Sequence, residues 1–316
     1  MDKCLICSSS NIVRYRYGNH LNKINTSYAK HLAGSFTAPF LLKFSSGIKY
    51  KLLFSPLYQI IKCNSCGYGH YEHQISADDL ETYYKSVYWQ AEGLALTDNE
   101  SEFPFLDDDR ANGQYIFVQD ELQRMSEAES FNILEIGAGS ALTSRMVQYK
   151  HPTAILDVVE PGYGWNKYYR DHAINKVENY FPFQSAKKYS YIHTSHWLEH
   201  VLDLYQVIKS MRAILQEGGL IFVEVPNCTE DYWALDVGDT PHIHFFTEIA
   251  LINLFRDHHF EMVKSCAVGF TNKRSLEQRK GGKLSSGACN EARMSVRYSI
   301  SRPGGESLRI LFRKVA

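Results

Sequence analysis

The chain has 316 residues, of which 44% are hydrophobic and 22% are charged, so it can bury a sizeable core in one large domain and a small one. Its net charge of −1 gives no general attraction to nucleic acids or anionic membranes. No apolar run approaches the roughly 18 residues of a membrane-spanning helix, and the first residues lack the layout of a signal peptide. We therefore expect a cytoplasmic protein without a membrane partner.

Four of the seven cysteines form two C-x-x-C pairs, Cys4 with Cys7 and Cys63 with Cys66. Two such pairs can place four thiolates around one tetrahedral zinc ion, and Gly67 can take the positive φ that turns backbone N–H groups toward the sulfurs. Four unrelated reduced thiols, or a redox pair, are the alternatives. We favour a structural zinc site.

Three regions follow one another along the chain. Residues 1–75 form the expected zinc-binding module, in which the aromatic and β-branched stretch 36–60 favours short strands. Residues 76–130 are expected to be a helical linker or lid. Ser76, followed three positions later by an acidic residue, predicts the start of a helix over 76–90. A polar stretch separates it from a second amphipathic helix, which ends near residue 125.

From residue 131 onward, buried strands and amphipathic helices alternate. This pattern predicts an α/β domain over 131–316, with a mostly parallel sheet and helices on both faces. The expected strands are 131–136, 153–160, 188–194, 220–225, 260–268 and 307–313, and the helices are 142–149, from about 165, 202–215 and 247–257. Ligands of such sheets bind beyond the carboxyl ends of the strands.

Two strand ends carry a pattern typical of cofactor binding. The first strand runs into Gly137 and Gly139, where glycines let the backbone approach a ligand at a helix N-terminus. The second ends in Glu160, and an acidic residue there can accept both hydroxyls of a ribose. Alone, each feature fits a tight turn or a surface acid; together they predict a cofactor that contains a nucleoside. The residues expected to contact it are Glu135, Gly137, Ala138, Gly139, Glu160, Pro161 and Ser195.

NAD(P) and S-adenosylmethionine both contain a nucleoside. A NAD-binding loop requires a third glycine, whereas Leu142 stands at that position. Glu135, just before the turn, fits a pyrophosphate poorly and suits the ammonium group of a methionine moiety. We therefore favour S-adenosylmethionine.

His196, Glu199 and His200 form the motif H-x-x-E-H, which binds zinc on a helix in some peptidases. Those enzymes need the motif in mid-helix and a third ligand downstream. Here His196 follows a strand and is expected in the strand-to-helix turn, so we do not expect a peptidase. At that edge of the sheet, a neutral imidazole could take a proton from a hydroxyl nucleophile.

The other residues near this motif have alternative roles. His242 and His244 are alternative bases, and Glu199 and His200 either take part in catalysis or only shape the turn and the cofactor pocket. His193, inside a strand by alternation, is expected to be structural. The candidate catalytic residues are His196, His244, Glu199 and His200.

Four motifs in order, ILEIGAG, VVEPG, SHWLEHV and LQEGGLIFVEVPN, resemble those of class I S-adenosylmethionine-dependent methyltransferases. The resemblance covers about residues 131–316. Upstream, KCNSCGYGHYEHQISADDLETYYKSVYW resembles the zinc-binding module of methyltransferases from sugar and secondary-metabolite pathways. PHIHFFTE and GGESLRILFRK resemble later segments of the same group. The resemblance implies a Rossmann-like seven-stranded sheet of order 3-2-1-4-5-7-6, S-adenosylmethionine as cofactor and a structural zinc ion.

This family suggests a small-molecule acceptor, with methylation of a hydroxyl or amine on a sugar, nucleotide-sugar or related metabolite. C-methylating relatives carry a further C-terminal domain, which we do not expect here. An RNA methyltransferase with a zinc module and an inactive zinc-stabilised scaffold are the alternatives. The basic segment 273–297 could bind a diphosphate or be a solvated loop, and we do not expect a nucleic-acid partner.

Overall fold

The computed structural model describes residues 3–16, 59–72, 75–84, 108–125, 131–234, 242–271 and 301–316. The basic segment 273–297 and nearly all of the stretch 36–60 lie outside these residues. Within the described part of the chain, no helix is long and apolar enough to cross a membrane.

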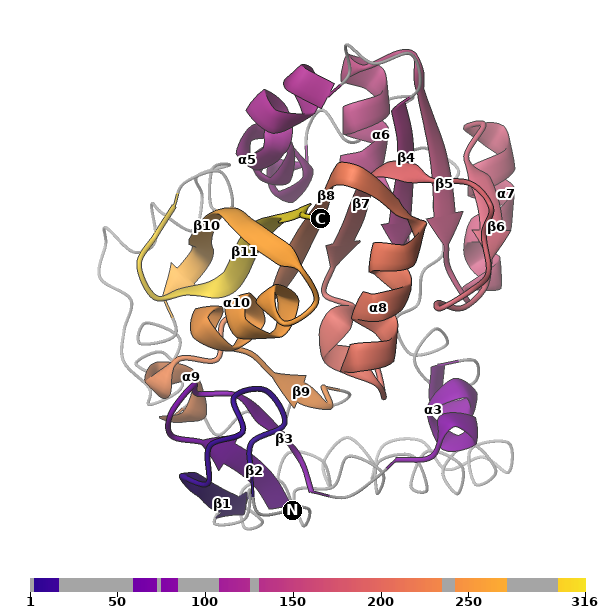
Figure 1. Ribbon diagram of the computed structural model, residues 1–316. Helices are drawn as coiled ribbons and strands as arrows, with labels where there is room; N and C mark the ends of the chain where they lie inside the picture. The colour runs from indigo at the N-terminus through magenta and orange to yellow at the C-terminus, as the bar shows by residue number, and fades with distance from the viewer. Residues whose placement is uncertain are drawn as a thin grey trace, which may run out of the picture.

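A seven-stranded sheet forms the centre of the larger domain (Figure 1), in the order β10-β11-β8-β7-β4-β5-β6. Numbered along the chain within this sheet and read from the β6 edge, the order is 3-2-1-4-5-7-6, so the expected methyltransferase topology is confirmed. β11 runs antiparallel to both of its neighbours, β8 and β10, and the other strand pairs are parallel. The strands are β4 (Phe131–Ile136), β5 (Ala154–Val159), β6 (Asn175–Glu178), β7 (Tyr189–Ser195), β8 (Leu215–Pro226), β10 (Phe260–Thr271) and β11 (Gly305–Lys314).

Helices cover both faces of this sheet. Successive residues of each strand point to opposite faces, and apolar side chains occur on both. On β4, Ile133 packs in a core with α5 (Asp109–Met125), α6 (Leu142–Lys150) and α7 (Asn166–Asp171). Its neighbour Leu134 packs in a second core with α8 (Leu204–Ile214) and α10 (Glu248–Arg256). The carboxyl ends of the strands therefore lie between two layers of helices.

Helix α8 shows how the local sequence produces these elements. The Asp203 carboxylate accepts a hydrogen bond from the Gln206 N–H at 2.9 Å and so caps the helix N-terminus. Leu204, Val207 and Ile208 are buried together with Met211, at the helical spacing of one face. Burying each such side chain stabilises the fold by about 1.5–3 kcal/mol.

A second, small sheet combines strands of the N-terminal module with one strand of the larger domain. Its order is β1-β2-β3-β9, all antiparallel, with β1 (Ile12–Arg16), β2 (Gln59–Cys63), β3 (Gly69–Tyr71) and β9 (His244–Phe245). β9 belongs to the segment before α10, so a strand of the larger domain completes the sheet of the N-terminal module (Figure 1). The short strands β6 and β9, and the helix α9 (Glu230–Ala234), were not predicted from the sequence.

Helix α3 (Ala77–Tyr83) lies beyond the carboxyl ends of the central strands, apart from the helical layers (Figure 1). The predicted cap is confirmed, because the Ser76 hydroxyl accepts a hydrogen bond from the Asp79 N–H at 3.1 Å. Short 3-10 turns η3 (Tyr163–Trp165) and η4 (Leu198–His200) follow β5 and β7 at the same edge.

Candidate active site

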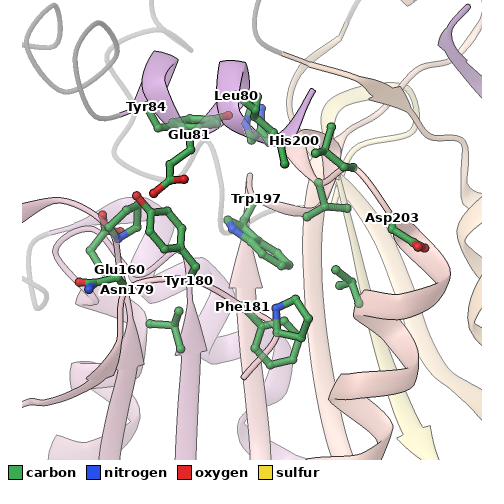
Figure 2. Close-up of a pocket in the computed structure, with 18 of the residues that line it drawn as sticks. Leu80, Glu81, Tyr84, Glu160, Asn179, Tyr180, Phe181, Trp197, His200 and Asp203 are labelled. Carbon is green, nitrogen blue, oxygen red and sulfur yellow. The ribbon is translucent and has the colours of Figure 1, made fainter. Parts of the chain in front are cut away.

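A cavity of about 480 Å³ lies between α3 and the carboxyl ends of β4, β5, β6 and β7. In Figure 2, Glu81 extends from α3 toward the strand ends, Trp197 stands in the middle, and Glu160 and Asn179 lie on one side. Of the predicted site residues, those that line the cavity are Gly137, Gly139, Glu160, Pro161, His196 and His200. This is the position at which ligands bind in parallel α/β sheets.

The two glycines after β4 have different surroundings. Both have positive φ, +70° at Gly137 and +49° at Gly139. A Cβ atom at Gly137 would lie 2.5 Å from the Trp197 ring, whereas one at Gly139 would meet nothing within 4 Å. The loop is therefore packed closely at Gly137 and open to the cavity at Gly139. Ala138, between them, is buried and does not line the cavity.

Glu160 holds two loops together at the end of β5. Its carboxylate accepts the Gly139 N–H at 2.9 Å and the Gly162 N–H at 2.6 Å. Burial raises the pKa of this carboxyl, and the two N–H donors oppose that shift. Each oxygen retains a further lone pair, so Glu160 can also accept hydrogen bonds from a ligand in the cavity.

Glu135 and Ser195 are placed behind the cavity rather than on its lining. The Glu135 side chain faces Ser144 of α6, and burial raises its pKa to about 8 despite that neighbour. Ser195 accepts a hydrogen bond from the Gln114 amide at 3.0 Å, and Gln114 accepts another from the Thr143 hydroxyl. Ser195 thus links the end of β7 to α5 and α6.

His196 occupies the turn after β7, as the sequence predicts, with a φ of +52°. Its Nδ1 lies 3.3 Å from Glu199, and its Nε2 lies 3.3 Å from Glu224. Burial opposes the charged form, but the two carboxylates outweigh it and raise the pKa of His196 to about 9. An imidazole that keeps its proton at neutral pH is a poor base, so this environment disfavours the expected role in proton removal.

Glu224 was not predicted as a site residue. It is fully buried at the end of β8, where it accepts a hydrogen bond from Arg309 Nε at 2.5 Å and lies 3.6 Å from Arg110 Nε. Burial alone would raise its pKa, but His196 and the two arginines hold it well below the usual range. A sequence signal existed, because Glu224 and Arg309 interrupt two apolar strands and face each other in register.

His244 lies away from the cavity, in β9. Its Nε2 donates to the Val201 carbonyl at 2.8 Å, so Nδ1 accepts the Tyr68 hydroxyl at 2.7 Å. Burial lowers its pKa to about 3. With both ring nitrogens engaged, His244 is placed to join the small sheet to the larger domain, not to act on a substrate. His193 is likewise buried, stacked on Phe222 in the sheet.

The cavity also contains residues from the loop after β6. Asn179, Tyr180, Phe181 and Pro182 line it. In Figure 2, Asn179 and Tyr180 lie beside Glu160, and Phe181 lies below Trp197. Sequence reasoning missed them because β6 is four residues long and mostly exposed, without a hydrophobic pattern. In this sheet order, the loop lies at the third strand end, beside the expected ribose position.

Glu199, His200 and His242 form a cluster at one end of the cavity. The His200 ring lies 4.9 Å from the His242 ring and 6.0 Å, edge on, from Tyr84 of the α3 terminus. Burial lowers the pKa of His242 to about 4, against the opposing effect of Glu199. His242 is therefore a neutral imidazole at pH 7.

The four cysteines of the two C-x-x-C pairs converge at the tip of the small sheet. Cys4 Sγ lies 3.6 Å from Cys66 Sγ, and Cys7 Sγ lies 3.5 Å from Cys63 Sγ. All four sulfurs lie within 4.8 Å of one another, and none is in a disulfide. A zinc–sulfur distance of about 2.3 Å gives a tetrahedral S···S separation of about 3.8 Å, so these thiols fit one zinc ion. Gly67 has the expected positive φ, at +75°.

Comparisons with known proteins agree with this architecture. A family model described as "Methyltransferase domain" matches residues 111–265. No curated protein sequence matches the chain.

Several solved structures are similar in fold. One, assigned as a sarcosine dimethylglycine methyltransferase from Galdieria sulphuraria, has 17% identity and a TM-score of 0.44 over 63% of this chain and 84% of its own. An S-adenosylmethionine-dependent methyltransferase from Clostridium acetobutylicum has 9% identity and a TM-score of 0.44 over 67% of this chain and 94% of its own. The plantazolicin methyltransferase BpumL has 13% identity and a TM-score of 0.43 over 75% of this chain and 94% of its own.

The family match spans the helix α5, the glycine loop, the turn of His196 and most of the sheet. The sheet has the strand order that the family motifs imply. The chain therefore contains a methyltransferase domain, with the strand order expected of class I S-adenosylmethionine-dependent methyltransferases, and is a methyltransferase enzyme.

Proposed function

We propose that this methyltransferase acts on a small molecule, at a hydroxyl or amine of a sugar, nucleotide-sugar or related metabolite. The observation that carries the proposal is a single cavity of about 480 Å³ that joins the cofactor loops to His196, His200 and Tyr84, with α3 across it. Its volume falls in the range of small-molecule sites, about 300–1,000 Å³.

The cofactor half of the cavity fits S-adenosylmethionine. Glu160 has lone pairs for ribose hydroxyls, and the open space beside Gly139 admits a ligand close to the backbone. We assign the adenine to the side of Tyr180 and Phe181, which present aromatic faces there. Glu135 does not line the cavity, and we propose that it acts on the ammonium group of the cofactor through the loop.

The other half of the cavity is the proposed acceptor site. Trp197, Tyr84 and His200 line it together with Leu80 and Val201. Flat aromatic faces beside a few polar groups suit the ring of a sugar or of a similar metabolite. S-adenosylmethionine supplies an already activated methyl group, so the protein contributes chiefly by aligning the acceptor with it.

His196 has a positioning role in this proposal. Its ring bridges two buried carboxylates, Glu199 and Glu224, at 3.3 Å each. The charged imidazole neutralises part of their charge and fixes the turn between the cofactor half and the acceptor half of the cavity.

We further propose a structural zinc ion at Cys4, Cys7, Cys63 and Cys66. Four thiolates fill a tetrahedral shell, so such an ion has no position open for a substrate. We retain the division into a zinc-binding module over 1–75, a helical segment over 76–130 and a methyltransferase domain over 131–316.

The test is to follow the methyl group. Purified protein is incubated with methyl-labelled S-adenosylmethionine and either a metabolite extract or total RNA. We expect label in the small-molecule fraction, and much less with Glu160→Ala. Label that appears in RNA and not in metabolites would overturn the proposed acceptor class. Absence of transfer to both, together with absence of cofactor binding, would point to an inactive scaffold.

A further inference from the structure

Glu199 lies at the centre of three imidazoles. Its Oε1 is 3.3 Å from His196 Nδ1, 3.8 Å from His200 Nε2 and 3.9 Å from His242 Nε2. The Glu199 side chain is fully buried, and neither carboxylate oxygen has a hydrogen-bond partner among the described residues. A buried carboxylate in that state is costly unless cations compensate it. All three imidazoles lie near the same oxygen, so a cation held by His200 and His242 would lie next to this carboxylate.

The main chain holds His242 against the turn that carries Glu199 and His200. The Ile243 N–H donates to the Glu199 carbonyl at 2.8 Å. One residue further, the His244 ring donates to the Val201 carbonyl, also at 2.8 Å. Two hydrogen bonds therefore hold the start of β9 against η4. The side chains of Glu199, His200 and His242 lie together as a result.

The three candidate ligand atoms are close enough for one ion. Glu199, His200 and His242 offer atoms that all lie within 4.8 Å of one another. Zinc binds nitrogen and oxygen at about 2.0–2.2 Å, so two ligands of one tetrahedral ion lie about 3.4 Å apart. The two histidine–Glu199 distances exceed this separation by about half an ångström, and the two ring nitrogens need to approach by about 1.4 Å at most.

We propose that Glu199, His200 and His242 bind a divalent first-row metal ion, with zinc as the probe, at the acceptor end of the cavity. Two imidazoles and one carboxylate form a ligand set that zinc takes in catalytic sites, where a fourth position stays open. His200 lines the cavity, so the open position faces the proposed acceptor. The second histidine of this site comes from β9 and not from the H-x-x-E-H motif.

The role of this ion rests on the proposed function, whereas its binding does not. A divalent ion lowers the pKa of a hydroxyl that reaches it. The hydroxyl proton would pass to water while the oxygen forms a bond to the methyl carbon. The methyl carbon–sulfur bond breaks, and its electron pair stays on the sulfur. His196, whose Nδ1 lies 3.3 Å from Glu199, is then a positioning residue for the carboxylate ligand.

The test is a zinc titration of full-length protein in which the cysteine site is already filled. By isothermal titration calorimetry, we expect wild type to take up one further ion per chain. His242→Ala and Glu199→Gln should each weaken this uptake by at least about tenfold, since each removes one of three protein ligands. His259→Asn, an exposed histidine in the turn after α10, is the matched control and should bind like wild type.

Cobalt gives a second readout that does not depend on activity. In metal-free protein loaded with two equivalents of cobalt, the cysteine site contributes thiolate charge-transfer absorption, and the second site contributes only weak visible bands. His242→Ala should lose the visible bands of the second ion and keep the charge-transfer absorption. Unchanged S-adenosylmethionine affinity in His242→Ala would show that the variant is folded.

The outcomes separate this inference from the proposed function. If wild type takes up no second ion, or if His242→Ala takes it up as well as wild type does, the metal site is refuted whatever the acceptor. If the second ion binds but no small molecule is methylated, the site stands and the acceptor proposal fails. Loss of methylation in His242→Ala with unchanged cofactor affinity would support both.

Discussion

Glu160 combines a structural and a binding task in one carboxylate. It accepts the backbone N–H groups of Gly139 and Gly162 and lines the cofactor cavity. Glu160→Ala therefore loosens both loops and removes the ribose acceptor. We expect S-adenosylmethionine binding to weaken by about 1–3 kcal/mol, the usual cost of leaving such groups unpaired. Calorimetric titration gives the affinity, and Glu178→Ala, an exposed acid of β6, is the control. Unchanged affinity in Glu160→Ala would place the ribose elsewhere.

Glu135 makes stability depend on pH. Burial raises its pKa in the folded protein from 4.5 to about 8. Between these values the folded state keeps the proton and the unfolded state loses it. Its contribution to stability is thus complete below about pH 4.5 and is lost as the pH rises toward 8, with a slope of at most about 1.4 kcal/mol per pH unit.

Glu135→Gln should remove this contribution to the pH dependence. We expect urea unfolding of the variant to change less than wild type between pH 5 and pH 8, while Asp120→Asn, at an exposed position of α5, behaves like wild type. A wild-type protein whose stability does not fall relative to Glu135→Gln over that range would contradict a protonated Glu135.

The residues around Glu199 show what sequence spacing cannot supply. The glycine loop and Glu160 follow from strand ends, which a linear pattern locates. His242 joins Glu199 only because β9 pairs with β3 and its backbone bonds to η4. The contact between His242 and Glu199 depends on the tertiary structure, so sequence spacing alone indicated His196 instead. The charge of His196 likewise depends on Glu224, a residue of another strand.

At the scale of elements, the long and periodic segments were predicted and the short ones were not. The buried strands β4, β5, β7 and β8 and the amphipathic helices α8 and α10 agree with their predicted ranges to within a few residues, apart from an earlier start of β8. β6 and β9 have four and two residues, too few for a hydrophobic period to appear. They are nevertheless the elements that complete the cavity and the small sheet.

The pairing of β3 with β9 is stabilised by the Tyr68 hydroxyl, which donates to His244. Tyr68→Phe would leave the buried Nδ1 of His244 without its donor. We expect a loss of about 1–3 kcal/mol in unfolding free energy, with cofactor affinity nearly unchanged. Chemical denaturation measures the first and calorimetry the second. Tyr163→Phe, at a tyrosine that is 66% exposed, should change neither. Equal stability of Tyr68→Phe and wild type would mean that this bond contributes nothing to the junction.

At the scale of the whole molecule, the zinc module and the methyltransferase domain share one core. Cys4, Cys63 and Tyr68 pack in the same cluster as Leu254 of α10 and Ile192 of β7. Removal of the proposed zinc should therefore destabilise more than the first 75 residues, which the sequence alone would not suggest.

Cys63→Ser provides the test. We expect it to lose one zinc per chain by elemental analysis and to lower the midpoint of the main thermal transition. Cys228→Ser, at a buried cysteine outside the cluster, should keep the zinc. S-adenosylmethionine should raise the midpoint of both variants by mass action. If Cys63→Ser gives a separate early transition while the main one is unchanged, the two parts unfold independently.

The position of β9 in the small sheet also affects how the chain folds during synthesis. The module is translated first, yet its fourth strand is residues 244–245, which leave the ribosome only after most of the chain has been made. Contacts of such long sequence separation form late and slow down folding. Until then, the edge of β3 is an open strand to which other chains can add. The module thus emerges before the larger domain but is among the last parts to reach its native state, and its cysteines stay open to competing metals and oxidants until then.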